Sequence, residues 1–197
     1  MPQIEGLFNR SDFLNNAMNV ARMIASHCVA EGDTAVDATA GNGHDTLMLA
    51  RLVGEAGRVV AFDVQGSAVE KTWALLATHG LSDRVTLVTD SHTQMGKHVT
   101  GPVSCVMFNL GFLPGSDKTC TTKAESTLAA STVALSLLAL RGCVLWVVYP
   151  GHDGGGEERA LSKFVADLDP KEFNLFSWRP MNQTGHPPFL LGAQKRA

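Results

Sequence analysis

Residues 34–50, TAVDATAGNGHDTLMLA, decide how the rest of this chain is organised. The stretch opens with small and β-branched residues, which predict a short buried strand that ends near Ala38. Gly41 and Gly43 follow with little side-chain bulk around them, and apolar residues then recur at a helical spacing with Asp45 in the first turn. The stretch therefore predicts a strand, a glycine turn and a helix whose unpaired N–H groups face the turn.

This turn is typical of a ligand-binding loop, yet it fits two nucleotide-binding motifs poorly. A phosphate-binding loop needs Lys and then Ser or Thr after its last glycine, where this chain has His44 and Asp45. The dinucleotide fingerprint needs a third glycine, where this chain has Thr46. Asp45 would also repel a pyrophosphate. A ligand with a ribose and a cationic or zwitterionic end, such as S-adenosylmethionine, fits better, and a tight turn without a ligand is the alternative.

The composition bounds the class of protein. A chain of 197 residues, 45% hydrophobic and 18% charged, suits a single α/β domain over residues 1–197, with residues 1–16 as an N-terminal extension. The net charge of −3 does not indicate nucleic-acid binding, although it is compatible with a local basic patch. Without a membrane-length apolar run or a signal-peptide pattern, a cytoplasmic protein is expected. The cysteines lack CxxC spacing and are expected to be mostly reduced core thiols, and no metal site is predicted.

An acidic residue follows the second predicted strand. Residues 58–62, RVVAF, lead directly into Asp63, about twenty positions past the glycine turn. A carboxylate at this point can accept hydrogen bonds from both ribose hydroxyls, whereas the alternative is a surface carboxylate or a helix cap. Gln65 either adds a donor or only begins the next helix.

A polar cluster also follows the third predicted strand. Residues 84–89, RVTLVT, end in Asp90, Ser91 and His92. Because ligands bind at the carboxyl ends of strands in open α/β sheets, an acid and a hydroxyl here can meet an adenine amino group. The alternative is that Ser91 caps a short helix over residues 92–98.

The fourth predicted strand, residues 103–108, runs into a second informative loop. Asn109 stands at the strand end, where its side-chain carbonyl can accept a hydrogen bond from an amine. Gly111 leaves room for a ligand, and Phe112 can stack on a planar base. The alternative is an ordinary turn with a core phenylalanine.

The rest of the chain completes an alternating α/β pattern. Thr122 and Glu125 resemble a capping box, and the glycine-rich residues 150–158 are typical of a lid or substrate loop. The remaining expected elements are helices over residues 12–29, 67–79 and 121–140, strands over residues 143–149, 172–178 and 188–193, and a last helix that ends near Asp167.

Six stretches together resemble a known family: DATAGNGHDTLMLA, FDVQ, DSH, FNLGFLPGSDK, YPGHDGGGEE and NQTGHPPFLL. The chain is similar to class I methyltransferases of the putative rRNA methylase family, whose characterised members are tRNA 5-aminomethyl-2-thiouridine methyltransferases. The resemblance covers roughly residues 17 to 195. The family usually has Tyr where this chain has Phe112, and an acid where it has Thr93.

The resemblance implies a Rossmann-like class I methyltransferase fold. This is a seven-stranded, mostly parallel sheet in the order 3-2-1-4-5-7-6, with an antiparallel last strand and helices on both faces. It also implies S-adenosylmethionine as cofactor and the aminomethyl nitrogen of a wobble-position thiouridine as acceptor, with the tRNA anticodon stem-loop as partner. Whether the protein is a homodimer stays open.

The resemblance also implies roles for particular residues. Asn109, Gly111 and Phe112 fall in the catalytic loop. Separately from the resemblance, His152 or Asp117 is a candidate proton acceptor, because the reacting amine must lose a proton. The resemblance places the cofactor on Gly41, Asn42, Gly43, Asp63, Gln65, Asp90, Ser91 and His92. Further candidate cofactor-binding residues are Asp37, Asp45, Asn109 and Gly111.

Other functions remain open at this point. The same domain can methylate another RNA, a protein or a small molecule, or it can bind cofactor or RNA without catalysis. A nicotinamide-dependent oxidoreductase fits least, because the third fingerprint glycine is missing.

Overall fold

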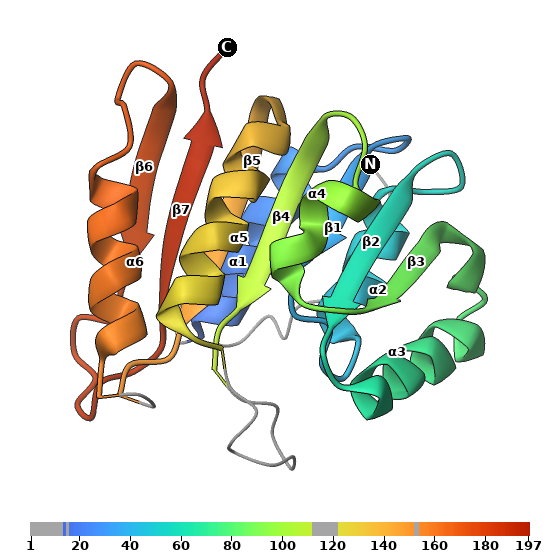
Figure 1. The fold of residues 1–197 in the computed structure, drawn as a ribbon, viewed down its shortest axis with the longest axis horizontal. Coiled ribbons are helices and arrows are strands. Elements are labelled where there is room, and N and C mark those ends of the chain that lie inside the picture. Colours follow the sequence, from blue (N-terminus) through green and yellow to red (C-terminus); the bar gives the residue numbers. More distant parts are fainter. Residues whose placement is uncertain (1–13, 15, 112–121, 152–153) are drawn as a thin grey trace.

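The computed structural model describes residue 14 and residues 16–111, 122–151 and 154–197. Seven strands form one sheet in the order β3-β2-β1-β4-β5-β7-β6 (Figure 1). The strands are β1 (Thr34–Asp37), β2 (Arg58–Asp63), β3 (Val85–Thr89), β4 (Val103–Asn109), β5 (Leu138–Val148), β6 (Phe173–Trp178) and β7 (Phe189–Lys195). The helices are α1 (Ala17–Cys28), α2 (His44–Leu52), α3 (Gly66–Thr78), α4 (Met95–His98), α5 (Ala124–Leu137) and α6 (Gly156–Ala166), with 3-10 turns η2 (Ser82–Arg84) and η3 (His92–Gln94).

The pairing of the strands confirms the predicted fold. Strands β1 to β5 pair in parallel, and β7 is antiparallel to both β5 and β6. Because β7 reverses direction, the end of β6 and the start of β7 lie at the same sheet edge as the ends of β1, β2 and β4. We call this edge the carboxyl edge. It faces the bottom of Figure 1.

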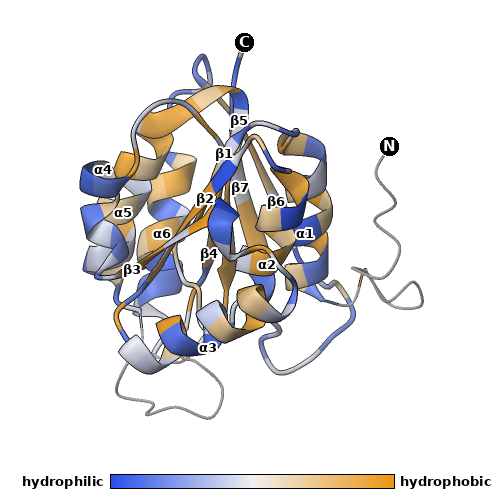
Figure 2. Ribbon diagram, turned by 90° about the vertical axis from the view of Figure 1, so that its right-hand side faces the viewer, coloured by the Kyte–Doolittle hydropathy of each residue, from blue (hydrophilic) through white to orange (hydrophobic). Residues whose placement is uncertain are grey.

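Helices cover both faces of the sheet (Figure 2). One hydrophobic cluster joins α1, α2 and α3 to the sheet, and another joins α4, α5 and α6 to its opposite face. Neighbouring strand residues alternate between the two clusters, with Cys105 in the first and Val106 in the second. A parallel sheet buried on both faces explains why its strands read as continuous apolar runs.

The first helix is shorter than predicted within the described part of the chain. It begins at Ala17, because the side chain of Asn16 accepts a hydrogen bond from the N–H of Met18 at 2.9 Å and caps the helix. The expected caps, Ser11 and Asp12, lie outside the described residues. Within the described chain, every helix is too short or too polar to span a membrane.

The start of β5 was predicted five residues too late, at Cys143. The strand begins at Leu138, which pairs with Val103, and an irregularity in the β4–β5 register follows. Arg141 has a φ of 67°, and a Cβ on Gly142 would lie 2.7 Å from the carbonyl oxygen of Val103. These two residues therefore form a bulge inside the strand, although their sequence is typical of a turn.

The cysteines in the described region are free, as predicted. Cys105 and Cys143 are buried on neighbouring strands with their sulfur atoms 3.7 Å apart, and Cys28 is half-buried. Cys120 lies outside the described residues.

Candidate active site

The turn after β1 is fixed between the two strands that flank β1. The N–H of Ala38 donates to the carbonyl of Met107 in β4, and the N–H of Ala40 donates to the carbonyl of Phe62 in β2, both at 2.8 Å. The turn therefore sits at the carboxyl edge where the strand order reverses, which is where open α/β sheets bind ligands.

Glycine is required in this turn by the packing of α3. Gly41 and Gly43 have φ values of 55° and 81°, which favour glycine. A Cβ on Gly43 would lie 2.9 Å from the Cα of Thr72, whose hydroxyl donates to the carbonyl of Gly41 at 3.2 Å. Asn42 lies half-buried between the glycines. The close packing of α3 is therefore a reason for glycine at position 43, in addition to the predicted approach of a ligand.

Asp63 binds the backbone of the turn and can still accept further hydrogen bonds. Its carboxylate accepts the N–H of Gly41 at Oδ2 and the N–H of Gln65 at Oδ1, each at 2.9 Å. An ionised carboxylate has about four acceptor positions, so these two bonds leave others for ligand hydroxyls. Gln65 contributes its backbone here, and its side chain makes no capping bond to α3.

Two buried carboxylates lie beneath the turn. Asp37 is 1% exposed, and its Oδ2 accepts the hydroxyl of Thr46 at 2.6 Å. Asp45 pairs with the guanidinium of Arg22 in α1 at 2.6 Å. Burial raises the pKa of Asp37 to about 7, and the negative charges of Asp45 and Asp63 add to this effect. The site therefore holds more negative charge than Arg22 neutralises when Asp37 is ionised.

We expect Asp37→Asn to flatten the pH dependence of folding stability. The pKa of Asp37 rises from 3.8 to about 7 on folding, so between these values the folded protein binds more protons than the unfolded chain. Stability from this group is complete below the lower value and is lost as pH rises through the higher one. Urea unfolding from pH 4 to pH 8 measures this slope for wild type and variant. Asp83→Asn, an exposed residue in η2, is the control, and parallel wild-type and Asp37→Asn curves would contradict the assignment.

The polar cluster after β3 divides into different roles. Ser91 caps η3 by accepting the main-chain N–H two residues on, as the alternative interpretation expected, and Asp90 is exposed. His92 is buried, with its Nδ1 3.2 Å from the carbonyl oxygen of Ala38 and its ring edge-on to Phe108. Burial lowers the pKa of His92, and its Nε2 has no hydrogen-bond partner among the described residues.

Asn109 and Gly111 lie at the end of β4, beside the glycine turn. The N–H of Asn109 donates to the hydroxyl of Thr39 at 2.7 Å, and the Asn109 residue is exposed. Gly111 has a φ of 135°, and a Cβ there would lie 3.7 Å from the ring of Tyr149, which follows β5. The structure thus brings Asn109 and Gly111 to the same edge as Asp63 and the glycine turn.

A buried carboxylate on α6 is linked through Thr122 to Gly111, which follows β4. Glu157 is fully buried and accepts the hydroxyls of Thr122 at 2.8 Å and Thr127 at 2.6 Å. Thr122 in turn accepts the N–H of Gly111 at 2.9 Å and donates its own N–H to the Gly111 carbonyl at 3.1 Å. These bonds hold Gly111 next to Thr122.

This arrangement corrects two predictions. The capping box of Thr122 and Glu125 is wrong, since Thr122 bonds to Glu157 and α5 begins after Lys123 without a side-chain cap. The last part of the predicted loop is helical, because α6 begins at Gly156. Three predicted catalytic residues lie outside the described residues: Phe112, Asp117 and His152.

Thr122→Val and Thr127→Val form a matched pair of variants. Each removes one hydroxyl bond to buried Glu157, so each should cost about 1–3 kcal/mol of stability. Only Thr122→Val also removes the hydroxyl that accepts the N–H of Gly111, so it alone should slow the reaction that the family resemblance implies. Urea unfolding and single-turnover kinetics separate the two effects, and equal rate losses would contradict a positioning role for Thr122.

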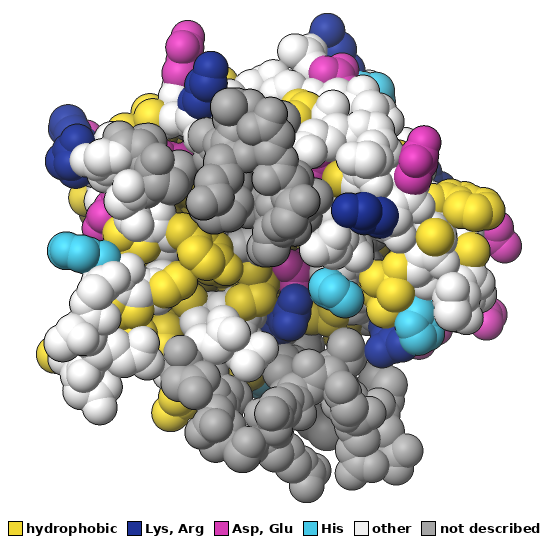
Figure 3. Space-filling model, turned by 90° about the horizontal axis from the view of Figure 1, so that it is seen from below, with side chains coloured by type: hydrophobic (Ala, Val, Ile, Leu, Met, Phe, Trp, Pro, Cys, Tyr) yellow, Lys and Arg dark blue, Asp and Glu magenta, His cyan; other side chains and the backbone are white. Residues whose placement is uncertain are grey.

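The carboxyl edge combines these features on one face. Seen from this edge, acidic, basic and histidine side chains gather beside a hydrophobic area (Figure 3). Among the described residues, no group of His, Cys, Asp and Glu is arranged to hold a metal ion. The arrangement suits an organic ligand with hydroxyls near Asp63 and a cationic part near Asp37 and Asp45.

Known proteins resemble this chain over most of its length. A family model described as "Putative rRNA methylase" matches residues 59–194. Over 186 residues the chain is 40% identical to the chloroplastic tRNA (mnm(5)s(2)U34)-methyltransferase of Arabidopsis thaliana. The match covers 89% of this chain and 68% of the Arabidopsis protein.

Two solved structures are similar along nearly their whole length. A putative rRNA methylase of Clostridium thermocellum is 41% identical with a TM-score of 0.89, covering 91% of this chain and 97% of that one. A putative methyltransferase of Streptococcus mutans, solved in complex with SAH, is 34% identical with a TM-score of 0.85, covering 91% and 98%. Because this family model matches more than half of the chain, the chain belongs to the family described as "Putative rRNA methylase" and is a methyltransferase.

Proposed function

We propose that this protein uses S-adenosylmethionine to methylate the amino group of 5-aminomethyl-2-thiouridine at the wobble position of tRNA. The observation that carries this proposal is the 40% identity, over 186 residues, to a relative named for that reaction. The carboxyl edge supports it, because Asp63 and Asn109 both lie there beside the glycine turn.

The described residues fit this cofactor. Asp63 has acceptor positions left for two ribose hydroxyls. Asp37 and Asp45, with Arg22 as the paired cation, suit a ligand whose sulfonium and ammonium groups are positive. The buried Nε2 of His92 provides one further polar contact at this edge. When bound, the cofactor supplies an activated methyl group.

The protein's own task is then mainly alignment of the acceptor. An amine must be neutral to react, so a proton has to leave before or during the transfer. We assign Asn109 to orient the amine through its amide carbonyl. Phe112 is assigned to pack on the modified base, and His152 or Asp117 to accept the proton.

The proposed partner is the anticodon stem-loop, bound at the carboxyl edge. We further propose that the chain acts as one domain, with the cytoplasm as its place of action. Light scattering of the purified complex tests whether a homodimer binds the RNA.

The test is transfer of labelled methyl groups to bulk tRNA from cells that lack this activity. Nucleoside analysis should recover the label in the methylated form of 5-aminomethyl-2-thiouridine. The matched control is tRNA from cells that do not install the aminomethyl group, which should take up no label. Label in another nucleoside of the tRNA, or no label in the tRNA at all, would overturn the proposal.

A further inference from the structure

A concave site lies at the carboxyl edge, away from the glycine turn. It has a volume of about 300 Å³ and is formed by the β6–β7 connection, the first turn of α6 and the residue after Tyr149. Its lining includes Pro150, Glu158, Arg179 and Gln183. Small-molecule sites begin at roughly this size, so one planar ring system fits better than a whole cofactor.

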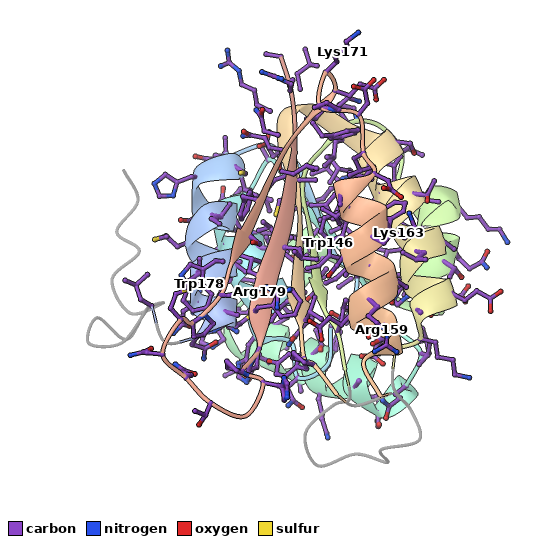
Figure 4. The ribbon with its side chains drawn as sticks, turned by 90° about the vertical axis from the view of Figure 1, so that its left-hand side faces the viewer. Trp146, Arg159, Lys163, Lys171, Trp178 and Arg179 are labelled. Carbon is purple, nitrogen blue, oxygen red and sulfur yellow. The ribbon has the colours of Figure 1, made fainter. Side chains whose placement is uncertain are left out.

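Arg179 provides a flat surface in this site. Its guanidinium lies 3.4 Å from the centroid of the Phe189 ring, at the start of β7. Phe189 is 1% exposed, whereas the Arg179 side chain is 46% exposed. Figure 4 shows Arg179 beside β6 and β7, far from Lys171 at the opposite end of the molecule. One face of the guanidinium is thus fixed on an aromatic ring while much of the side chain stays open to a ligand.

The charge in this site favours a neutral ligand. Glu158 lies 3.5 Å from the Arg179 guanidinium and is half-buried, so it offsets the positive charge and would repel a phosphate. The exposed amide of Gln183 can donate and accept hydrogen bonds along one edge of a planar ring. A nucleobase has this combination of a flat face and a polar edge, and loop bases in RNA commonly stack on arginine planes.

The sheet order separates this site from the cofactor residues. Asp63 ends β2 on one side of β4, while Pro150 follows β5 and Phe189 begins β7 on the other side. Asn109, at the end of β4, therefore lies between them. Two strand spacings, about 10 Å, separate β4 from β7, so a nucleotide next to one held at Asn109 can reach the site.

We propose that this site binds the base of a nucleotide that flanks the methylated one, stacked on Arg179 and hydrogen-bonded to Gln183. The inference rests on the proposed function for the identity of the RNA. The ligand class itself, an unpaired nucleobase, follows from the geometry and charge of the site.

The test is a double-mutant cycle on binding. Wild type and Arg179→Ala are titrated with an anticodon stem-loop that carries the aminomethyl group, and with versions that lack the base 5′ or 3′ of it. Arg179→Ala should weaken binding of the intact RNA by about ten-fold. Removing one of the two bases should weaken wild-type binding by the same factor as Arg179→Ala does. With that base absent, Arg179→Ala should cause little further loss. Additive losses at both positions would overturn the proposal.

Further variants separate stacking from charge and from folding. Arg179→Lys keeps the charge without the flat group, so it should bind like Arg179→Ala, and full rescue by lysine would overturn stacking. Lys171→Ala should bind like wild type. If Arg179→Ala melts early because it loses its packing on Phe189, the same cycle with Gln183→Ala decides the question.

The two proposals fail in different ways. Binding is measured without methyl transfer. If the enzyme methylates its tRNA but the losses in the cycle are additive, only the proposed nucleobase site at Arg179 is overturned. If wild type methylates no tRNA, the proposed function falls, whereas a non-additive cycle would still assign the site.

Discussion

Replacing Asn109 with alanine should slow methyl transfer by about 100-fold and leave cofactor affinity nearly unchanged. The main chain of Asn109 is fixed to the glycine turn through Thr39, while the exposed side chain stands at the edge where the acceptor must arrive. If its carbonyl aligns the amine, its loss is felt in the transition state rather than in cofactor binding.

Single-turnover methylation of the modified stem-loop, together with calorimetric titration of the cofactor, measures both quantities. Asn174→Ala changes an exposed asparagine near the start of β6, at the opposite sheet edge, and should have no effect on either. A wild-type transfer rate in Asn109→Ala would mean that Asn109 is structural and that the catalytic assignment is wrong.

Replacing Asp63 with asparagine should weaken cofactor binding by about 10- to 150-fold, which corresponds to roughly 1.5–3 kcal/mol. Asparagine keeps one carbonyl acceptor and replaces the other with a donor, so one charge-assisted bond to a ribose hydroxyl is lost. The same change also faces an NH₂ group toward the N–H of Gly41 or Gln65, which loosens the turn.

The matched control for this prediction is Asp83→Asn, the same chemical change at the exposed turn before β3. Calorimetry with the cofactor, and separately with its demethylated product, gives the affinities. Equal affinities for wild type and Asp63→Asn would remove Asp63 from the cofactor site. A loss confined to the transfer rate would move its role from binding to alignment.

The two predictions act on opposite sides of the glycine turn. Asp63 accepts the N–H of Gly41 from the β2 side, and Thr39 ties the turn to Asn109 on the β4 side. A variant that deforms the turn should therefore affect both affinity and rate. Separate effects of Asp63→Asn and Asn109→Ala would show that the turn keeps its shape in each variant.

The sequence by itself determined the strand, turn and helix over residues 34–52, and the acidic residue after the second strand. Helical and strand periodicities, glycine turns and caps depend on neighbours within a few residues, so they can be predicted locally. The edge shared by Asp63 and Asn109 also followed, because parallel strands end on the same side of a sheet.

Local rules failed where a distant partner decided the structure. Leu138 pairs with Val103 and thereby begins β5 inside a segment whose sequence predicts the end of a helix. Thr122 has the pattern of a helix cap, but its hydroxyl bonds to Glu157, 35 residues away in the chain. In both cases a tertiary contact outweighed the local preference, which is weak by comparison.

Only the tertiary structure placed several of the side chains that complete the site. Arg22 reaches Asp45 across 23 residues, and the hydroxyl of Thr39 meets the N–H of Asn109 across 70. The pocket at the β6–β7 connection joins Glu158 on α6 to Arg179 after β6. No periodicity or motif encodes such pairs, because they depend on the register of neighbouring strands and on which helices pack side by side once the whole sheet has formed.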